Sequence, residues 1–307
     1  MKSLHIETPL INSRALTVHA GRDIWLKLEA LQAPGSFKIR GIGLACQEYR
    51  RRGAKRFISS SGGNAGIAVA YAGRQLSVPV IVVVPETTTQ RAIAVIRQEG
   101  AQVIVHGASW HEANDLALSM VKESDAFLHP FDDPLLWQGH STLIDEVRSA
   151  GVKPDVVVLS VGGGGLLCGV VEGLHRNGWP DVPVIAVETE GADSFAQSVA
   201  AGHRVELPAI TSIATSLGAR KVCEQAFSWV QNHPISGIVV SDQAAVTACT
   251  QFLADHRIVV EPACGASLAV VYENPSAFER FSSVLVIVCG GATSTVEQLQ
   301  QWAKQGT

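Results

Sequence analysis

Lys38 is the side chain with the clearest capacity for covalent chemistry in this sequence. It lies in the segment 33–41, APGSFKIRG, where Pro34 and Gly35 predict a turn and Phe37 offers a flat ring beside the amine. A lysine amine must be neutral to attack an aldehyde, and partial burial lowers its pKa toward that state. A single lysine near a helix start is usually a solvated surface residue, so its chemistry depends on what the fold brings near it.

A run of glycines supplies a second chemical signal. It follows the strand-like segment 156–159 and precedes a predicted helix over 166–176, and its members are Gly162, Gly163, Gly164 and Gly165. Glycine lets backbone N–H groups approach an anion closely, and a helix dipole adds to the attraction. Because consecutive glycines are costly in conformational entropy, a phosphate site is favoured over a plain tight turn.

Another polar turn, formed by Ser61, Gly62, Gly63 and Asn64, precedes a predicted helix over 65–75. A hydroxyl, bare amides and a carboxamide at a helix N-terminus can hold a carboxylate. The alternative is an N-cap serine without any ligand, and the turn by itself does not decide between the two.

Cys289 follows a predicted strand over 284–288 and precedes two glycines. A thiol at this place can hydrogen-bond a ring nitrogen without giving it a full charge, although a cysteine viewed alone is more often a small buried hydrophobe. The reactive amine and the phosphate-binding turn together indicate an aldehyde cofactor with a phosphate group, which is pyridoxal phosphate.

A dinucleotide site is the competing interpretation of the glycine run. Gly163 and Gly165 are followed by an acid, Glu188, at the end of the next predicted strand. The third glycine of that motif is missing, because Cys168 takes its place. A nicotinamide-dependent dehydrogenase would also leave Lys38 and the turn at 61–64 unexplained.

The elements that must position these residues alternate along the chain. Strands are predicted at 24–28, 56–60, 78–84, 101–105, 155–159, 182–187 and 284–288. Helices are predicted at 37–50, 65–75, 88–98, 110–122 and 166–176. This order predicts an α/β protein of two lobes, each a mostly parallel twisted sheet covered by helices, with ligands at the carboxyl ends of the strands.

The segment 131–134, FDDP, is the expected junction between the lobes. We expect a large cofactor-binding domain over 1–36 and 135–307, and a small domain over 37–134. The chain has 307 residues, which is enough for two compact cores.

The composition is that of a globular protein, with 47% hydrophobic and 17% charged residues and a net charge of -4. The net charge argues against a broad nucleic-acid surface, and the uncharged stretch 156–171 is too short and too rich in glycine to span a membrane. The N-terminus lacks a signal-peptide core, and the 6 cysteines form no Cys-x-x-Cys pair. A cytoplasmic protein with reduced thiols is therefore expected.

Several segments together resemble the fold-type II pyridoxal-phosphate enzymes, which share the fold of the tryptophan synthase β chain, and among them the short serine/threonine dehydratases (serine ammonia-lyases). The resemblance spans nearly the whole chain. It is carried by the segments 35–41, 60–66, 130–134, 160–169, 187–189, 261–266 and 288–291. Members of this family are often homodimers, so a homodimer is expected here.

The resemblance implies a role for each matching position. Lys38 would bind the aldehyde carbon of the cofactor and serve as the catalytic base, with Phe37 packed beside the ring. Asn64 would contact the ring hydroxyl, and Cys289 would face the pyridine nitrogen. The phosphate would be bound by Gly162, Gly163, Gly164, Gly165 and Leu166, and the substrate carboxylate by Ser61, Gly62, Gly63 and Asn64.

Relatives also bind a monovalent cation, usually potassium. The matching ligands would be the side chain of Glu188 and the carbonyls of Gly162, Ala192 and Leu217. One departure concerns Gly62, where many close relatives have alanine and a related branch has glycine. Losing that methyl group is expected to widen the pocket beside the substrate and to alter the relative rates on serine and threonine.

The implied reaction is β-elimination from L-serine, and from L-threonine, to give pyruvate or 2-oxobutyrate plus ammonia. Serine racemase and cysteine or threonine synthase are neighbouring activities in the same class. A ligand-binding pseudoenzyme is disfavoured because the lysine is intact. The chain also ends soon after the catalytic segments, so inhibition by isoleucine is not expected.

Overall fold

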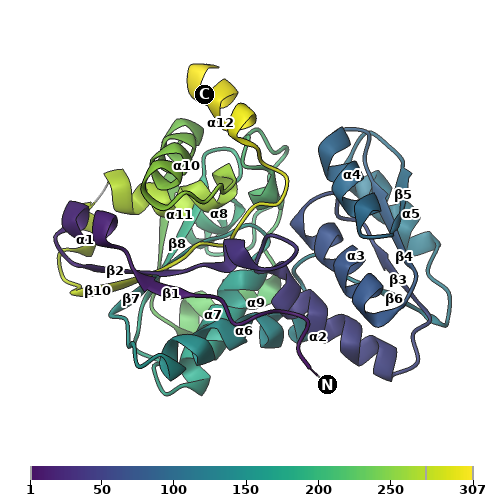
Figure 1. The fold of residues 1–307 in the computed structure, drawn as a ribbon, viewed down its shortest axis with the longest axis horizontal. Helices are drawn as coiled ribbons and strands as arrows, with labels where there is room; N and C mark the ends of the chain where they lie inside the picture. The colour runs from purple at the N-terminus through teal and green to yellow at the C-terminus, as the bar shows by residue number, and fades with distance from the viewer. Residues whose placement is uncertain (1, 274, 306–307) are drawn as a thin grey trace.

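The computed structural model describes residues 2–273 and 275–305, and its strands form two separate sheets (Figure 1). The 6-stranded sheet has the order β1-β2-β10-β7-β8-β9. Its strands are β1 (Leu10–Asn12), β2 (Asp23–Lys27), β7 (Val156–Ser160), β8 (Val184–Thr189), β9 (Ile235–Val240) and β10 (Ser283–Ile287). Only β1 is antiparallel to its neighbour among these pairings. The two-lobed α/β fold with mostly parallel sheets is confirmed.

The 4-stranded sheet has the order β5-β4-β3-β6, and all its pairings are parallel. Its strands are β3 (Arg56–Ser59), β4 (Val80–Val84), β5 (Gln102–Val105) and β6 (Asp125–Phe127). Strands β4 and β7 are buried along their whole length, as expected for β-branched runs covered by helices on both faces.

Helices cover both sheets. Those of the small unit are α3 (Asn64–Leu76), α4 (Gln90–Gln98) and α5 (Trp110–Ser119). Those around the large sheet are α1 (Arg14–Ala20), α6 (Pro134–Ser149), α7 (Gly165–Arg176), α8 (Ser194–Ala201), α9 (Glu224–Asn232), α10 (Asp242–His256), α11 (Pro262–Glu273) and α12 (Val296–Gln305). Figure 1 shows α10 and α11 on one face of the large sheet and α6, α7 and α9 on the other.

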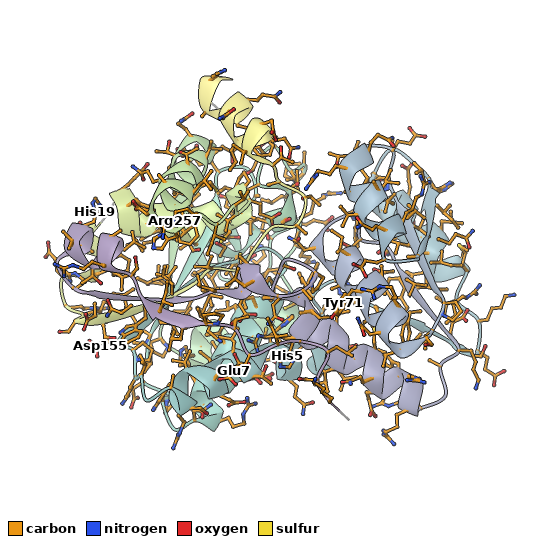
Figure 2. The ribbon with its side chains drawn as sticks, viewed as in Figure 1. His5, Glu7, His19, Tyr71, Asp155 and Arg257 are labelled. Carbon is orange, nitrogen blue, oxygen red and sulfur yellow. The ribbon has the colours of Figure 1, made fainter. Side chains whose placement is uncertain are left out.

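Helix α2 (Lys38–Arg51) joins the two units, because it packs against α6 on one side and α3 on the other. The approach to α6 is close: a methyl group at Gly139 would lie 2.4 Å from the Arg40 carbonyl oxygen. The N-terminal segment that carries His5 and Glu7 passes beside this region (Figure 2). The division into domains at 36/37 and 134/135 stays a prediction, although the segment 131–134 does connect β6 to α6.

Several predicted elements are shorter than their patterns suggest, and for two of them the contacts explain the difference. The strand predicted over 78–84 begins at Val80, because the Val78 N–H is bound by the Gly73 carbonyl of α3 and Pro79 has no N–H to donate. The helix predicted over 110–122 ends at Ser119, since the Asp125 carboxylate accepts the Lys122 N–H at 2.9 Å and turns the chain toward β6.

No helix in the described part of the chain is long and apolar enough to cross a membrane. All six cysteines are buried and have free thiols in the structure. They are Cys46, Cys168, Cys223, Cys249, Cys264 and Cys289.

Candidate active site

Lys38 is positioned by a short antiparallel bridge at the end of β10. Ser36 pairs with Gly290, the Phe37 N–H donates to the Cys289 carbonyl at 3.1 Å, and the Gly291 N–H donates to the Gly35 carbonyl at 3.0 Å. Gly35 has a φ of 79°, a conformation that glycine adopts without strain. The first residue of α2 is thus fixed beside the carboxyl end of a central strand.

The Lys38 amine donates to the Pro130 carbonyl at 2.6 Å and lies 5.1 Å from the centre of the Phe37 ring. The side chain keeps part of its surface accessible, yet enough protein surrounds the amine that burial lowers its pKa to about 8, against a smaller opposing effect of Cys289 and Glu261. An amine with this pKa is neutral in a useful fraction at physiological pH. The sequence-based expectation of a partly buried, reactive lysine therefore has a geometric basis.

The glycine run lies between β7 and α7 and packs against Phe131. A methyl group at Gly163 would lie 2.2 Å from the Phe131 ring, so only glycine fits there. Gly164 caps α7 with a φ of 95°, and the Gly163 carbonyl accepts the Cys223 N–H at 3.0 Å. Since the first N–H groups of a helix lack internal acceptors, the run presents amides at a helix N-terminus, which suits a phosphate.

Pro130 and Phe131 connect the two halves of the site. Pro130 accepts the Lys38 amine, and its neighbour packs on Gly163. These contacts bring the lysine and the glycine run into one region, although residues 38 and 162 are 124 positions apart in the sequence. In the sequence, the segment 130–134 contributes to the family resemblance but has no predicted role in the site.

The turn at 61–64 opens α3 on the other side of the site. Gly63 caps the helix without a side-chain hydrogen bond, and its N–H donates to the Ser61 hydroxyl at 3.3 Å. Asn64 is buried: its amide nitrogen donates to Glu261 at 2.7 Å, and its oxygen accepts the Ala292 N–H at 3.2 Å. The turn therefore places a hydroxyl, backbone amides and a fixed carboxamide together.

Thr88 occupies the space next to Gly62. A methyl group at position 62 would lie 2.7 Å from both the hydroxyl oxygen and the methyl carbon of Thr88. The missing methyl group therefore leaves no free space at this point, because the Thr88 side chain fills that volume. The sequence pattern could not reveal this contact, since Thr88 follows a different strand.

Cys289 is 7% exposed, and its pKa is raised well above the usual value by a hydrogen bond with Cys264 and by burial. The thiol is therefore neutral at physiological pH. A neutral donor at this place fits the expected contact with an uncharged pyridine nitrogen.

Glu188 lies at the end of β8, and its carboxylate accepts the N–H groups of Phe195 at 2.9 Å and Ala196 at 2.7 Å. Burial raises its pKa to about 8, and the two N–H donors lower it only in part. Ser194, the first residue of α8, has a buried hydroxyl without a hydrogen-bond partner. A buried carboxylate near an unpartnered hydroxyl oxygen fits a monovalent cation.

The other proposed cation ligands lie at the same end of the large sheet. The Val161 N–H donates to the Val187 carbonyl at 2.8 Å, which aligns Gly162 with the end of β8. A methyl group at Gly162 would lie 3.0 Å from the Leu217 Cα, so these two backbones are neighbours. Among the described residues, no cluster of three or more His, Cys, Asp or Glu side chains could hold a metal ion.

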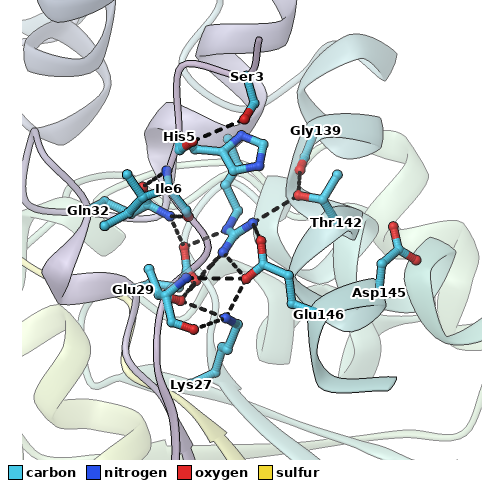
Figure 3. A network of polar contacts seen from close by, with 12 residues as sticks. Ser3, His5, Ile6, Lys27, Glu29, Gln32, Gly139, Thr142, Asp145 and Glu146 are labelled. Carbon is cyan, nitrogen blue, oxygen red and sulfur yellow. Dashed lines mark hydrogen bonds and ion pairs between the residues drawn. The ribbon is translucent and has the colours of Figure 1, made fainter. Parts of the chain in front are cut away.

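Glu261 and Arg40 are site-supporting residues to which the sequence patterns assign no role. Arg40, two residues after Lys38, is fully buried and forms ion pairs with Glu29 at 2.7 Å and Glu146 at 2.6 Å. Lys27 pairs with the same Glu146 (Figure 3). This network ties the start of α2 to β2 and α6, and only a charged residue on the apolar side of a helix pattern hints at it in sequence.

The comparisons with known proteins agree with this geometry. The sequence model of the family described as "Pyridoxal-phosphate dependent enzyme" matches residues 1–290, and the chain belongs to this family. The human protein named L-serine dehydratase/L-threonine deaminase is 47% identical over 98% of this chain and 95% of its own length.

Solved structures place the chain in the same group. The fungal L-serine ammonia-lyase from Rhizomucor miehei superimposes with a TM-score of 0.95, at 37% identity and with complete coverage (100%) of both chains. Maize serine racemase is more distant, with a TM-score of 0.86 and 26% identity over 98% of this chain and 92% of its own. The family resemblance seen in the motifs is confirmed.

Proposed function

We infer that this protein is an ammonia-lyase that acts on L-serine, and on L-threonine, with pyridoxal phosphate as cofactor. The observation that carries this function is the placement of the Lys38 amine, with a pKa of about 8, near Cys289 and on Pro130, whose neighbour Phe131 packs on the glycine run. The names of the similar human and fungal proteins support the substrate class.

Pyridoxal phosphate, when bound, supplies an electron-withdrawing ring that accepts the electrons left on the substrate when its α-proton departs. Lys38 would hold the aldehyde carbon of the cofactor, and its Nζ would accept the α-proton of the bound substrate. A base with a pKa of about 8 is matched to proton transfer near neutral pH.

The turn at 61–64 would orient the substrate through its carboxylate. The free N–H groups in the first turn of α3 and the Ser61 hydroxyl are suited to this anion. Gly162, Gly163, Gly164, Gly165 and Leu166 would hold the phosphate, which fixes the opposite end of the ring system.

Cys289 would favour elimination over transamination. Its thiol stays neutral because of burial and the contact with Cys264. As a neutral partner, the thiol would leave the ring nitrogen uncharged, which would favour loss of the β-hydroxyl over transamination.

We further propose a potassium ion bound by Glu188 and by the carbonyls of Gly162, Ala192 and Leu217, where it would brace the phosphate-binding run. The buried Glu188 carboxylate and the unpartnered Ser194 hydroxyl support this site. A cytoplasmic homodimer is proposed from the family resemblance and from the buried free thiols.

The test is the release of oxo acid from L-serine and L-threonine, side by side, by the purified protein reconstituted with pyridoxal phosphate. Parallel reactions contain potassium or choline as the only monovalent cation, and D-serine is measured in each. We expect pyruvate and 2-oxobutyrate, with higher rates in potassium. D-serine as the main product would make a racemase the better interpretation, and no product from either amino acid would refute the proposed activity.

A further inference from the structure

Glu261 is a buried acid that no step of the proposed reaction uses. It precedes α11, is 5% exposed, and accepts a hydrogen bond from the Asn64 amide nitrogen at 2.7 Å. The Ser216 hydroxyl also donates to it. Because Asn64 begins α3 and Glu261 directly precedes α11, this contact joins the two units directly across the site.

The contacts of Asn64 define the orientation of its carboxamide. The oxygen accepts the Ala292 backbone N–H at 3.2 Å, whereas the nitrogen donates to Glu261. A carboxylate accepts hydrogen bonds and a backbone N–H donates them. In the reverse orientation, the amide oxygen would face the Glu261 carboxylate and the amide nitrogen would face the Ala292 N–H, so neither contact could be a hydrogen bond. The second hydrogen of the amide nitrogen is left for a further acceptor, and its nearest protein partner is the Ser216 hydroxyl at a long 3.4 Å.

Packing fixes Glu261 in turn. A methyl group at Gly291 would lie 2.6 Å from the Glu261 Cβ and 2.7 Å from its Cγ, so the side chain lies directly on the backbone of the segment that positions Lys38. Gly291 has a φ of 146°, and the Glu261 N–H donates to the Gly290 carbonyl at 3.3 Å. The acid is thus held against the same strand end as the catalytic lysine.

We propose that Glu261 is a positioning residue that locks the Asn64 carboxamide with one N–H turned toward the ring oxygen of the cofactor. This inference rests on the proposed function, which places Asn64 at that oxygen. A fixed N–H donor there stabilises the ionised form of the ring oxygen. Without Glu261, the amide nitrogen loses its carboxylate acceptor, and the carboxamide is free to rotate about its last bond.

The experiment is a double-mutant cycle on the reconstituted holoenzyme with Glu261→Ala, Asn64→Ala and the double variant. Two quantities are measured: the visible absorption spectrum of the bound cofactor and its dissociation constant from equilibrium dialysis. We expect Glu261→Ala to shift the absorption band and to weaken cofactor binding about tenfold, the size of one charge-assisted hydrogen bond. In the Asn64→Ala background, the same change should alter neither quantity appreciably.

Two further variants keep the test decisive. Glu261→Gln retains an acceptor oxygen for Asn64 and should keep the wild-type spectrum, which guards against misfolding of the alanine variant. Glu172→Ala removes a half-buried carboxylate on α7 and should change neither measurement. Equal effects of Glu261→Ala with and without Asn64 would overturn the positioning role, whereas failure of the wild type to capture the cofactor would instead refute the proposed function.

Discussion

The position of the Lys38 amine is fixed by three contacts. The backbone before it is hydrogen-bonded to the end of β10, its amine donates to the Pro130 carbonyl, and the ring of Phe37 lies beside the amine. Burial is the main cause of its lowered pKa. The residue type and the turn before it are visible in the sequence, but the Pro130 contact is not, because it joins positions 92 residues apart.

The pKa of Lys38 gives a pH dependence with a definite sign. Only the neutral amine attacks an aldehyde, so the rate of cofactor capture by the apoenzyme should rise about tenfold per pH unit below the pKa and level off above it. The bend is expected near pH 8. Stopped-flow absorbance with added pyridoxal phosphate measures this rate, and Lys38→Arg serves as the control without capture. A rate that continues to rise to pH 10 would indicate an unperturbed lysine.

At the scale of the elements, each site residue lies where a strand or bridge ends and a helix begins. This much follows from the alternating pattern of β-branched and amphipathic segments, which correctly predicts most strands and helices between residues 24 and 176. The contacts between elements do not follow from it. Thr88 beside Gly62, Phe131 on Gly163, and Glu261 on Asn64 each join segments whose distance depends on how the sheets pack.

The turn at 61–64 and the loop after β4 are expected to set substrate preference together. In Gly62→Ala, the new methyl group would lie 2.7 Å from the Thr88 side chain, so either the turn at 61–64 or the loop that carries Thr88 must shift. We expect the ratio of kcat/KM for serine to that for threonine to change by about threefold or more, since sub-ångström shifts beside a substrate cost about 1 kcal/mol.

Thr88→Ala tests this coupling, because it removes the atoms that the new methyl group would meet. The double variant should recover most of the wild-type ratio of kcat/KM values. An unchanged ratio in Gly62→Ala would remove position 62 as a determinant of specificity.

At the scale of the whole molecule, the two units meet along α2, and a buried ion network anchors its first turn. Arg40, Glu29, Glu146 and Lys27 form this network (Figure 3). The large and small sheets could be predicted as two lobes from their strand order. The buried ion pairs could not, because a charged residue on the apolar side of a helix pattern hints at burial but does not identify its partners.

Breaking this network should destabilise the fold strongly. Arg40→Met leaves Glu29 buried without its guanidinium partner, and loss of one member of a buried pair costs about 3–5 kcal/mol. Urea unfolding of the variant and the wild type measures the difference in free energy of unfolding. Glu48→Gln, which removes surface pairs with Arg51 and Arg52, is the control and should change stability little. Equal small effects of both changes would contradict a structural role for the network.

The most direct test of the central claim is chemical capture of the cofactor on the enzyme. Holoenzyme is reduced with borohydride, digested, and mapped by mass spectrometry, with Lys38→Ala as the matched control. We expect a single phosphopyridoxyl label on Lys38, together with loss of oxo-acid release in a control variant that remains folded. Labelling of another lysine, or turnover retained by Lys38→Ala, would contradict the assignment.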